Sequence, residues 1–91
     1  MIYEENCVFC NIPKEKILWQ NEDYLIFRSI RPEAPSHILV VPKNHVEFFE
    51  PGTNLIHEIV DFAASLKCKG SRVMFSTGNY IQINHAHVHV L

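Results

Sequence analysis

The chain has 91 residues, of which 47% are hydrophobic and 20% charged, and its formal net charge is −2. This length suits one compact domain, and the composition is that of a soluble globular protein, which excludes global disorder. The small negative charge excludes the basic surface typical of nucleic-acid-binding proteins and of proteins that bind anionic membranes.

The N-terminal sequence MIYEENCVFC has no cationic segment leading into an apolar run, so no signal peptide is predicted. The longest apolar runs are far shorter than the roughly 20 residues that span a bilayer. We therefore expect a cytoplasmic protein with neither membrane nor nucleic-acid partners. In that reducing compartment the three cysteines do not predict a disulfide framework.

Short strands and turns are predicted in the first half of the chain. The segment ILWQ (17–20) predicts a strand, 21–23 a turn, and the aromatic and β-branched YLIFRSI (24–30) a second strand. The two prolines of RPEAP predict a loop. The run SHILVV (36–41) predicts a third strand, which Pro42 ends.

In the second half, apolar residues at helical spacing predict a helix over 54–67, with Thr53 or Asn54 as its N-cap and Gly70 as its stop. RVMFST (72–77) predicts a strand, Gly78-Asn79 a tight hairpin, and 80–91 a long final strand. These elements predict a single α+β domain over 1–91, an antiparallel β-sheet with one main α-helix on one face.

Three of the six histidines occupy alternate positions near the C-terminus, in the sequence HAHVHVL: His85, His87 and His89. Side chains alternate between the two faces of a strand, so the three imidazoles would share one face. The residues between them would lie on the opposite, apolar face: Ala86, Val88 and Val90.

Such a cluster is compatible with more than one chemistry. One metal ion bound by all three histidines is disfavoured, because the outer two side chains lie about 13 Å apart along a strand while metal–nitrogen bonds are about 2 Å. A metal site made of two of these histidines and a third ligand from a distant part of the chain fits better. Alternatively, a neutral imidazole acts as nucleophile or base while a protonated neighbour stabilises a phosphate anion. Inert, hydrogen-bonded histidines are the least expected interpretation for three on one face.

Cys7 and Cys10 have the Cys-x-x-Cys spacing of a zinc knuckle, which needs two further ligands. Spacing alone does not choose among the candidates: His37, His45, His57, Cys68 and His85. Two small buried residues without a metal would explain the pair equally well.

Taken together, these segments resemble the histidine triad (HIT) superfamily. The hallmark of this superfamily, His-x-His-x-His followed by apolar residues, is matched by HAHVHVL (85–91). The segment PEAPSHILVVPKNH (32–45) is similar to the strand and loop that face the triad. The segment CVFCNI (7–12) resembles the amino-terminal knuckle of zinc-containing members. The match covers nearly the whole chain in the correct order. The resemblance implies the same α+β fold and a homodimer.

The resemblance also implies a nucleotidyl hydrolase or transferase that acts at the α-phosphate of nucleoside phosphoramidates or dinucleoside polyphosphates, with a purine nucleotide as substrate. His87 would attack the α-phosphorus to form a nucleotidyl-histidine intermediate, which water then cleaves. A backbone carbonyl would hold the other ring nitrogen of His87. His89 and His37 match positions that line the phosphate site.

A structural zinc ion is implied as well, with ligands matched by Cys7, Cys10, His45 and His85. Further positions match the nucleotide site of the superfamily. The base pocket corresponds to Val8, Phe9, Ile12, Phe27 and Ile30; Ser29 takes the ribose position; Ser76 and Gln82 are the candidates for contact with phosphate.

Two other functions remain compatible with these residues. Serines at positions 29 and 76 and a short segment before the triad suit a non-catalytic, zinc-stabilised nucleotide-binding module with a degenerate phosphate loop. A metal-dependent hydrolase, in which triad histidines bind a catalytic metal, is the third hypothesis.

Overall fold

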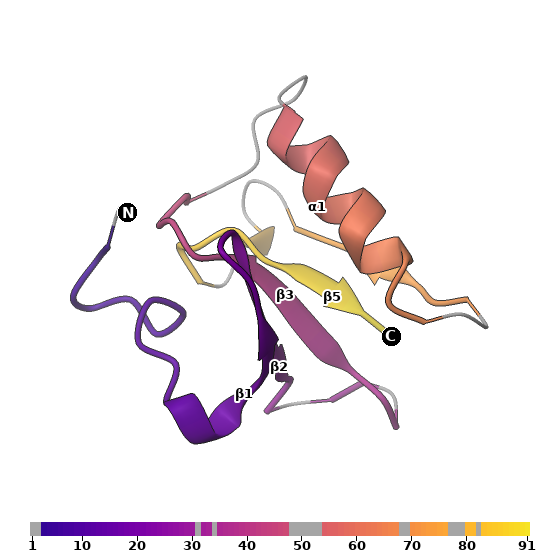
Figure 1. The fold of residues 1–91 in the computed structure, drawn as a ribbon, viewed down its shortest axis with the longest axis horizontal. Helices are drawn as coiled ribbons and strands as arrows, with labels where there is room; N and C mark the ends of the chain where they lie inside the picture. Colours follow the sequence, from indigo (N-terminus) through magenta and orange to yellow (C-terminus); the bar gives the residue numbers. More distant parts are fainter. Residues whose placement is uncertain are drawn as a thin grey trace.

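The computed structural model describes residues 3–30, 32–33, 35–47, 54–67, 70–76, 80–81 and 83–91. Within these residues, five strands form one antiparallel sheet in the order β1-β2-β3-β5-β4 (Figure 1). The strands are β1 (Ile17–Gln20), β2 (Tyr24–Arg28), β3 (Ile38–Pro42), β4 (Val73–Met74) and β5 (Val88–Val90), and the helices are the 3-10 helix η1 (Lys14–Lys16) and α1 (Asn54–Ala64). The predicted α+β class with one main helix is confirmed.

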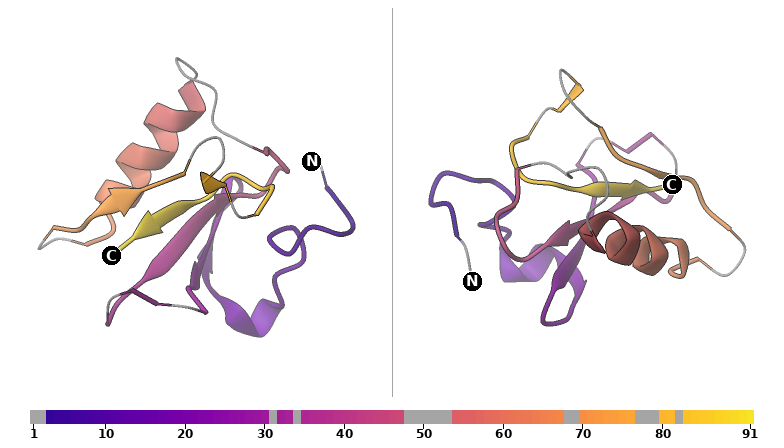
Figure 2. Two further views of the ribbon diagram at one scale, coloured as in Figure 1. Left: turned by 180° about the vertical axis from the view of Figure 1, so that it is seen from behind. Right: turned by 90° about the horizontal axis from the view of Figure 1, so that it is seen from above.

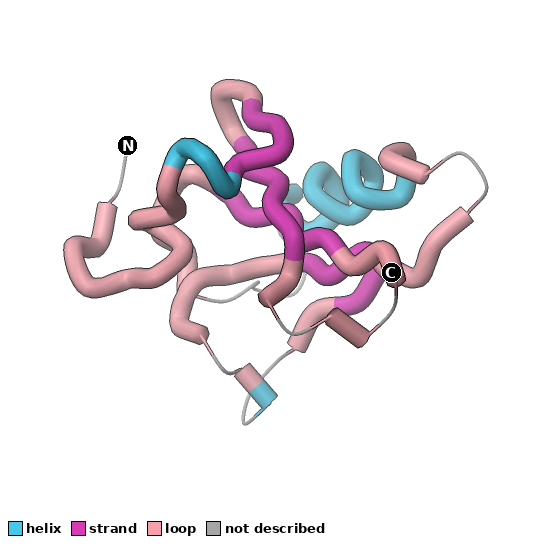
Figure 3. Tube along the Cα trace, turned by 90° about the horizontal axis from the view of Figure 1, so that it is seen from below, coloured by secondary structure: helices cyan, strands magenta, loops and turns pink. Residues whose placement is uncertain are grey.

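The sheet has an apolar layer on each face. Alternate residues of β2, β3 and β5 pack against α1 and form one cluster, built around Tyr24, Ile26, Val40, Val88, Val90, Ile59 and Ala63. The intervening residues of β2 and β3 pack against the N-terminal segment and form the second cluster, with Cys7, Phe9, Phe27, Leu39 and Val41 at its centre. The N-terminal segment and α1 accordingly lie on opposite sides of the sheet, as seen from behind (Figure 2) and from below (Figure 3).

The first hairpin is the predicted one. Strand β1 has the expected bounds, and the Asn21 side-chain oxygen accepts hydrogen bonds from the backbone N–H groups of Asp23 and Tyr24, which closes the turn. β2 ends earlier than expected, at Arg28, although the Ser29 N–H still donates to the His37 carbonyl at 2.9 Å. β3 includes Pro42, which pairs with Tyr24 at the end of the ladder.

The helix is shorter than its apolar pattern predicts, ending at Ala64 rather than residue 67. The Ser65 hydroxyl donates to the Phe62 carbonyl, and the Leu66 N–H donates to the Ala63 carbonyl, so the chain tightens into a turn. Gly70 has a φ of 95°, a conformation that glycine adopts readily, but it lies six residues beyond Ala64, so the prediction that it ends the helix is wrong. The alternative cap Thr53 lies outside the described residues, as does the predicted hairpin at Gly78-Asn79.

The prediction of a long final strand over 80–91 is wrong, because regular strand pairing begins only at Val88. Backbone groups before it bond elsewhere: the His85 N–H donates to the Ile83 carbonyl at 2.8 Å, and the Ala86 N–H donates to the Val46 carbonyl. The fourth strand is likewise reduced, to Val73–Met74. Even so, the side chains of Ala86, Val88 and Val90 enter the apolar layer under α1, as the alternation predicts.

No helix among the described residues is both long enough and apolar enough to cross a bilayer.

Candidate functional site

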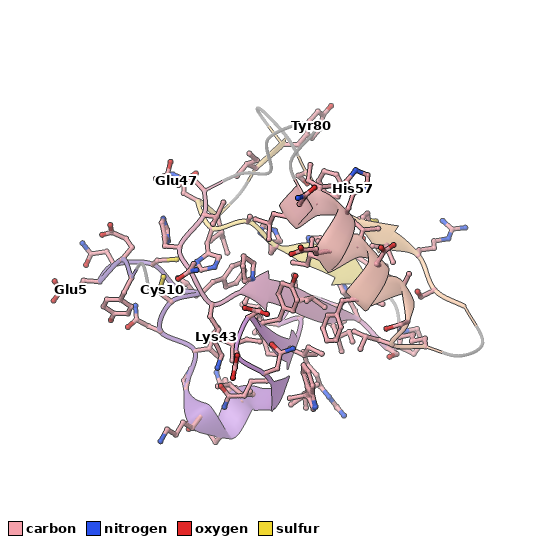
Figure 4. The ribbon with its side chains drawn as sticks, turned by 45° about the horizontal axis from the view of Figure 1, so that its top comes forward. Glu5, Cys10, Lys43, Glu47, His57 and Tyr80 are labelled. Atoms are coloured by element: carbon pink, nitrogen blue, oxygen red, sulfur yellow. The ribbon has the colours of Figure 1, made fainter. Side chains whose placement is uncertain are left out.

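A cluster of two cysteines and two histidines joins three distant parts of the chain. Cys7 and Cys10 lie on the N-terminal loop, His45 follows β3, and His85 precedes β5. Their ligand atoms all lie within 4.8 Å of one another. Figure 4 places Cys10 where the N-terminal loop meets the chain leading to Glu47, with His57 away from it on α1.

The spacing of these atoms suits a tetrahedral metal ion. The Cys7 Sγ lies 3.3 Å from the His85 Nδ1, and the Cys10 Sγ lies 3.4 Å from the His45 Nδ1 and 3.5 Å from the His85 Nδ1. In a tetrahedral zinc site, with bonds of about 2.3 Å to sulfur and about 2.0 Å to nitrogen, a sulfur and a nitrogen ligand lie about 3.5 Å apart. The four side chains could therefore hold a metal ion, and the mixed sulfur and nitrogen donors are those that zinc prefers.

The tautomer of His85 is suited to this role. Its Nε2 lies 2.8 Å from the Pro42 carbonyl oxygen, which can only accept, so Nε2 carries the hydrogen and Nδ1 presents its lone pair to the two sulfurs. The residue is fully buried, and burial lowers the pKa of His85, with the bond to Pro42 opposing that shift. The neutral, metal-binding form is thereby favoured.

The ring of His87 is held by the backbone of His85, two residues earlier in the chain. Its Nδ1 lies 2.9 Å from the His85 carbonyl oxygen, so this nitrogen carries the hydrogen and Nε2 keeps a free lone pair. The ring is half-buried and contacts two others, with the Phe9 centroid at 5.1 Å and the His89 centroid at 5.0 Å, both nearly perpendicular to it. When the ring is neutral, this arrangement places the lone pair on Nε2, which can then act as a nucleophile.

His37 and His89 form a second hydrogen-bonded pair. The Glu33 N–H donates to the His37 Nδ1 at 3.0 Å, so a neutral His37 carries its hydrogen on Nε2, which lies 2.8 Å from the His89 Nδ1. A neutral His89 then carries its own hydrogen on Nε2, as a donor. Burial is the main cause that lowers the pKa of His89, followed by the nearby His87 and His37.

The triad histidines therefore divide between two networks. His85 belongs to the metal cluster, whereas His89 is paired with His37, and His87 stands between them. His57, a candidate fourth metal ligand by spacing alone, is exposed on α1, and Cys68 lies outside the described residues. Among the described residues, the one metal-binding group includes a single triad histidine.

The residues matched to a nucleotide site fall into two sets. Phe9 and Phe27 are buried in contact with each other, with ring centroids 5.3 Å apart, and the partly buried Ile12 packs against the same cluster. Val8 and Ile30 are exposed, to 62% and 87%. Ser29 is half-buried at the end of β2, beside the backbone of His37.

A hollow of about 200 Å³, which includes space open to solvent, lies beside His87. It is lined by Glu47, Ser76, Ile81, Ile83, His85, Ala86 and His87. Ser76, one of the two residues matched to phosphate contact, therefore shares a surface with His87. The other, Gln82, lies outside the described residues.

Residue types alone did not point to two of the groups that organise this site. The Pro42 carbonyl sets the tautomer of His85, and the Glu33 N–H sets that of His37. Both are backbone groups, which every residue of the chain offers, so no side-chain pattern could have singled them out. The hollow also brings in Glu47, which no motif indicated.

Comparison with known proteins gives one family. The HIT domain family matches residues 11–91, a range that starts just after Cys10. Adenosine 5'-monophosphoramidase HINT3 of Danio rerio is 30% identical over 104 residues, covering 97% of this chain and 65% of the relative. The chain thus spans slightly less than two thirds of that relative's length.

Solved structures share the fold. A histidine triad protein from Clostridium difficile has a TM-score of 0.78 at 28% identity, covering 99% of this chain and 92% of that one. A Zn-bound histidine triad family protein from Mycobacterium smegmatis has a TM-score of 0.71 at 25% identity, covering 94% of this chain and 73% of that one. With most of its length matched by the family, the chain belongs to the HIT domain family.

Proposed function

We propose that the protein is a nucleotidyl hydrolase or transferase that acts at the α-phosphate of a purine nucleoside phosphoramidate or a dinucleoside polyphosphate. The observation that carries this proposal is the geometry of His87. Its Nδ1–H is committed to the His85 carbonyl at 2.9 Å, which leaves the lone pair of the neutral ring on Nε2, and His87 lines an open hollow. The phosphoramidase name of the Danio rerio relative favours an adenosine phosphoramidate as the first substrate to test.

In the first step the His87 Nε2 attacks the α-phosphorus, and the bond from phosphorus to the leaving amine or phosphate breaks. The leaving group departs with the electron pair of that bond and takes up a proton. Water then attacks the same phosphorus, the bond between phosphorus and Nε2 breaks, and the nucleoside monophosphate is released. The His85 carbonyl stabilises the positive charge that develops on the ring, because the Nδ1–H bond to it becomes charge-assisted.

The pair of His37 and His89 supplies a donor at the other side of the phosphate. In the tautomers set by the Glu33 N–H, the His89 Nε2–H donates to a phosphate oxygen or to the leaving group. Hydrogen bonds aimed at developing charge are a large source of rate enhancement in such reactions. Ser76, which lines the same hollow as His87, provides a further hydroxyl donor.

For the nucleoside, the base would lie against the apolar residues of the N-terminal loop and β2: Val8, Phe9, Ile12, Phe27 and Ile30. The exposed Val8 and Ile30 offer apolar surface that a purine ring could cover. Ser29 would hydrogen-bond the ribose, and Gln82 is the proposed amide donor to phosphate.

We also propose zinc as the metal of the Cys7, Cys10, His45 and His85 cluster. When bound, the ion supplies structural cross-linking between the N-terminal loop and the triad segment. It is not required to touch the substrate, because His87 and His89 belong to other contacts.

The first test is AMP release from adenosine 5'-phosphoramidate by the zinc-loaded protein and by His87→Ala. We expect the variant to lose at least about 1,000-fold in kcat, as removal of a nucleophile does in other enzymes. The matched control is His57→Ala, which removes an exposed histidine from α1 and should leave the rate unchanged. Equal AMP release by wild type and His87→Ala would reject the proposal.

The same assay separates the main alternative. A non-catalytic nucleotide-binding module would bind AMP in calorimetry and yet release none from the phosphoramidate. A chelator that abolishes turnover while the fold persists would instead favour the metal-dependent hydrolase. The expected homodimer is tested independently by light scattering of the purified protein.

A further inference from the structure

We propose that Phe9 is a positioning residue for His87, and that metal binding by the two flanking cysteines holds it in place. The inference rests on the proposed function, in which His87 is the nucleophile. It gives the metal cluster an effect on the reaction beyond cross-linking, transmitted through one aromatic side chain.

Phe9 lies at the junction of the metal cluster and the triad. Its side chain is buried, and its ring meets the rings of both His85 and His87 at nearly right angles, with centroids 5.9 Å and 5.1 Å away. Phe27 packs against it from the sheet, with ring centroids 5.3 Å apart. One side chain of the N-terminal loop therefore touches a metal-binding histidine and the proposed nucleophile together.

The hydrogen bond of His87 does not by itself define the direction of Nε2. The bond from Nδ1 to the His85 carbonyl holds one atom of the ring, and the ring can still tilt about that contact. Edge-to-face packing by the rings of Phe9 and His89 restricts the tilt. In-line attack on phosphorus is sensitive to this direction, because a misplacement of about 1 Å can lower a rate by about 100-fold.

The position of Phe9 depends in turn on the residues on either side of it. Cys7 and Cys10 place their sulfurs 3.3 Å and 3.5 Å from the His85 Nδ1, at the spacing of ligands that share one ion. The loop between them consists of turns rather than a helix or strand, closed by hydrogen bonds from Asn11 to the carbonyls of Cys7 and Val8, and an ion shared by the two sulfurs would add a constraint at both of its ends. Metal binding at both ends should therefore keep the Phe9 ring against His87.

This role differs measurably from lining a base pocket, the role that the resemblance implies for Phe9. A pocket residue contributes to substrate binding, so its loss raises KM. A positioning residue acts on His87 even when no nucleotide is bound, and its loss lowers kcat.

The experiment compares zinc-loaded wild type, Phe9→Leu and Phe62→Leu without nucleotide, at one neutral pH, by long-range proton–nitrogen NMR of the histidine rings. Phe62 is a matched control, since it is a partly buried phenylalanine of α1 on the opposite face of the sheet. We expect His87 to be a single Nδ1–H tautomer in wild type and Phe62→Leu. In Phe9→Leu its signals should broaden or shift toward a mixture of tautomers, and kcat should fall about tenfold with KM changed less.

Metal removal is the second change to be compared with Phe9→Leu. A chelator should change the His87 signals of wild type in the same direction as Phe9→Leu does. In Phe9→Leu itself, metal removal should add little, because two changes that act through one contact are not additive. Phe9→Tyr, which keeps the ring edge, should restore the wild-type spectrum when zinc is bound.

Unchanged His87 signals in a folded, zinc-loaded Phe9→Leu protein would overturn the inference. So would a rise in KM alone. If Phe9→Leu does not fold, the response of wild-type His87 to the chelator decides the question, and no response overturns the inference. Failure of the proposed function is a different result, since it appears as equal AMP release by wild type and His87→Ala whatever the His87 spectra show.

Discussion

His85 takes part in three contacts that most histidines do not combine. Its Nδ1 faces two sulfurs, its Nε2–H donates to the Pro42 carbonyl, and its own carbonyl accepts from the His87 ring. Spacing within the chain disfavoured one ion bound by all three triad histidines, because the outer two imidazoles along a strand are too far apart. The different roles of His85 and His87 were expected only from the resemblance to the HIT superfamily. The acceptor of each ring nitrogen could not be predicted, since it depends on backbone groups brought close only by folding.

The lowered pKa of His89 leads to a prediction about how the stability of the protein depends on pH. Burial first, then the imidazoles of His87 and His37, lower the pKa of His89, while the Glu33 carboxylate raises it. The unfolded chain, with a histidine pKa of about 6.5, then binds a proton that the native protein does not. The contribution of His89 to the free energy of unfolding is complete above about pH 6.5 and is lost as the pH falls toward the lower pKa of His89 in the folded state.

His89→Gln tests this by replacing the titrating ring with a neutral hydrogen-bonding side chain. We expect the unfolding free energy of wild type to fall more than that of the variant between about pH 7.5 and about pH 5.5, because the variant lacks one depressed histidine pKa. Urea unfolding at the two pH values measures both differences. Both zinc-loaded proteins keep the same metal ligands, so acid release of the metal affects them alike. Identical pH dependence would contradict the prediction.

At the scale of elements, the sequence predicted the paired strands of the first half better than the segment around the triad. β1 and the turn at 21–23 follow directly from local residue preferences, and the structure adds that the Asn21 side chain closes that turn. The pattern from residue 80 to 91 alternates like a strand, yet only Val88–Val90 forms one. The His85 carbonyl accepts from a side chain and the Ala86 N–H donates to the Val46 carbonyl, so the ladder cannot extend through them.

Helix α1 packs against the face of the sheet that includes β5, and this contact predicts how the free energy of unfolding responds to shortening a buried side chain of the helix. Ile59 is fully buried between α1 and the sheet, in the layer that contains Val88 and Val90. Ile59→Ala should lower the free energy of unfolding by about 2–4 kcal/mol, because it removes apolar contacts and leaves a cavity. Urea denaturation measures the loss.

His57→Ala, on the exposed surface of the same helix, should change that free energy by less than about 0.5 kcal/mol. A loss in Ile59→Ala as small as that of His57→Ala would mean that the helix contributes little to holding the sheet.

At the scale of the whole molecule, the metal cluster links the N-terminal loop, which is not part of the sheet, to the segments that follow β3 and precede β5. The contact of Cys10 with His45 spans 35 positions and that of Cys7 with His85 spans 78. A ligand bound only by the folded state stabilises that state by mass action. A domain of this size buries a modest apolar core, so we expect a metal bound at this cluster to contribute a large share of the stability.

The prediction for the whole protein is one zinc ion per chain, whose removal lowers Tm by more than about 10 °C. Structural zinc contributes several kcal/mol to folding, and each kcal/mol shifts Tm by about 4–8 °C in a domain of this length. Metal analysis and calorimetry with and without a chelator measure the two quantities. Cys10→Ser should lose the zinc and melt at the temperature of the chelated wild type, whereas Cys68→Ser, which replaces the third cysteine, should keep the metal. A chelated wild type that melts at the same temperature as the zinc-loaded protein would show that the cluster does not stabilise the fold.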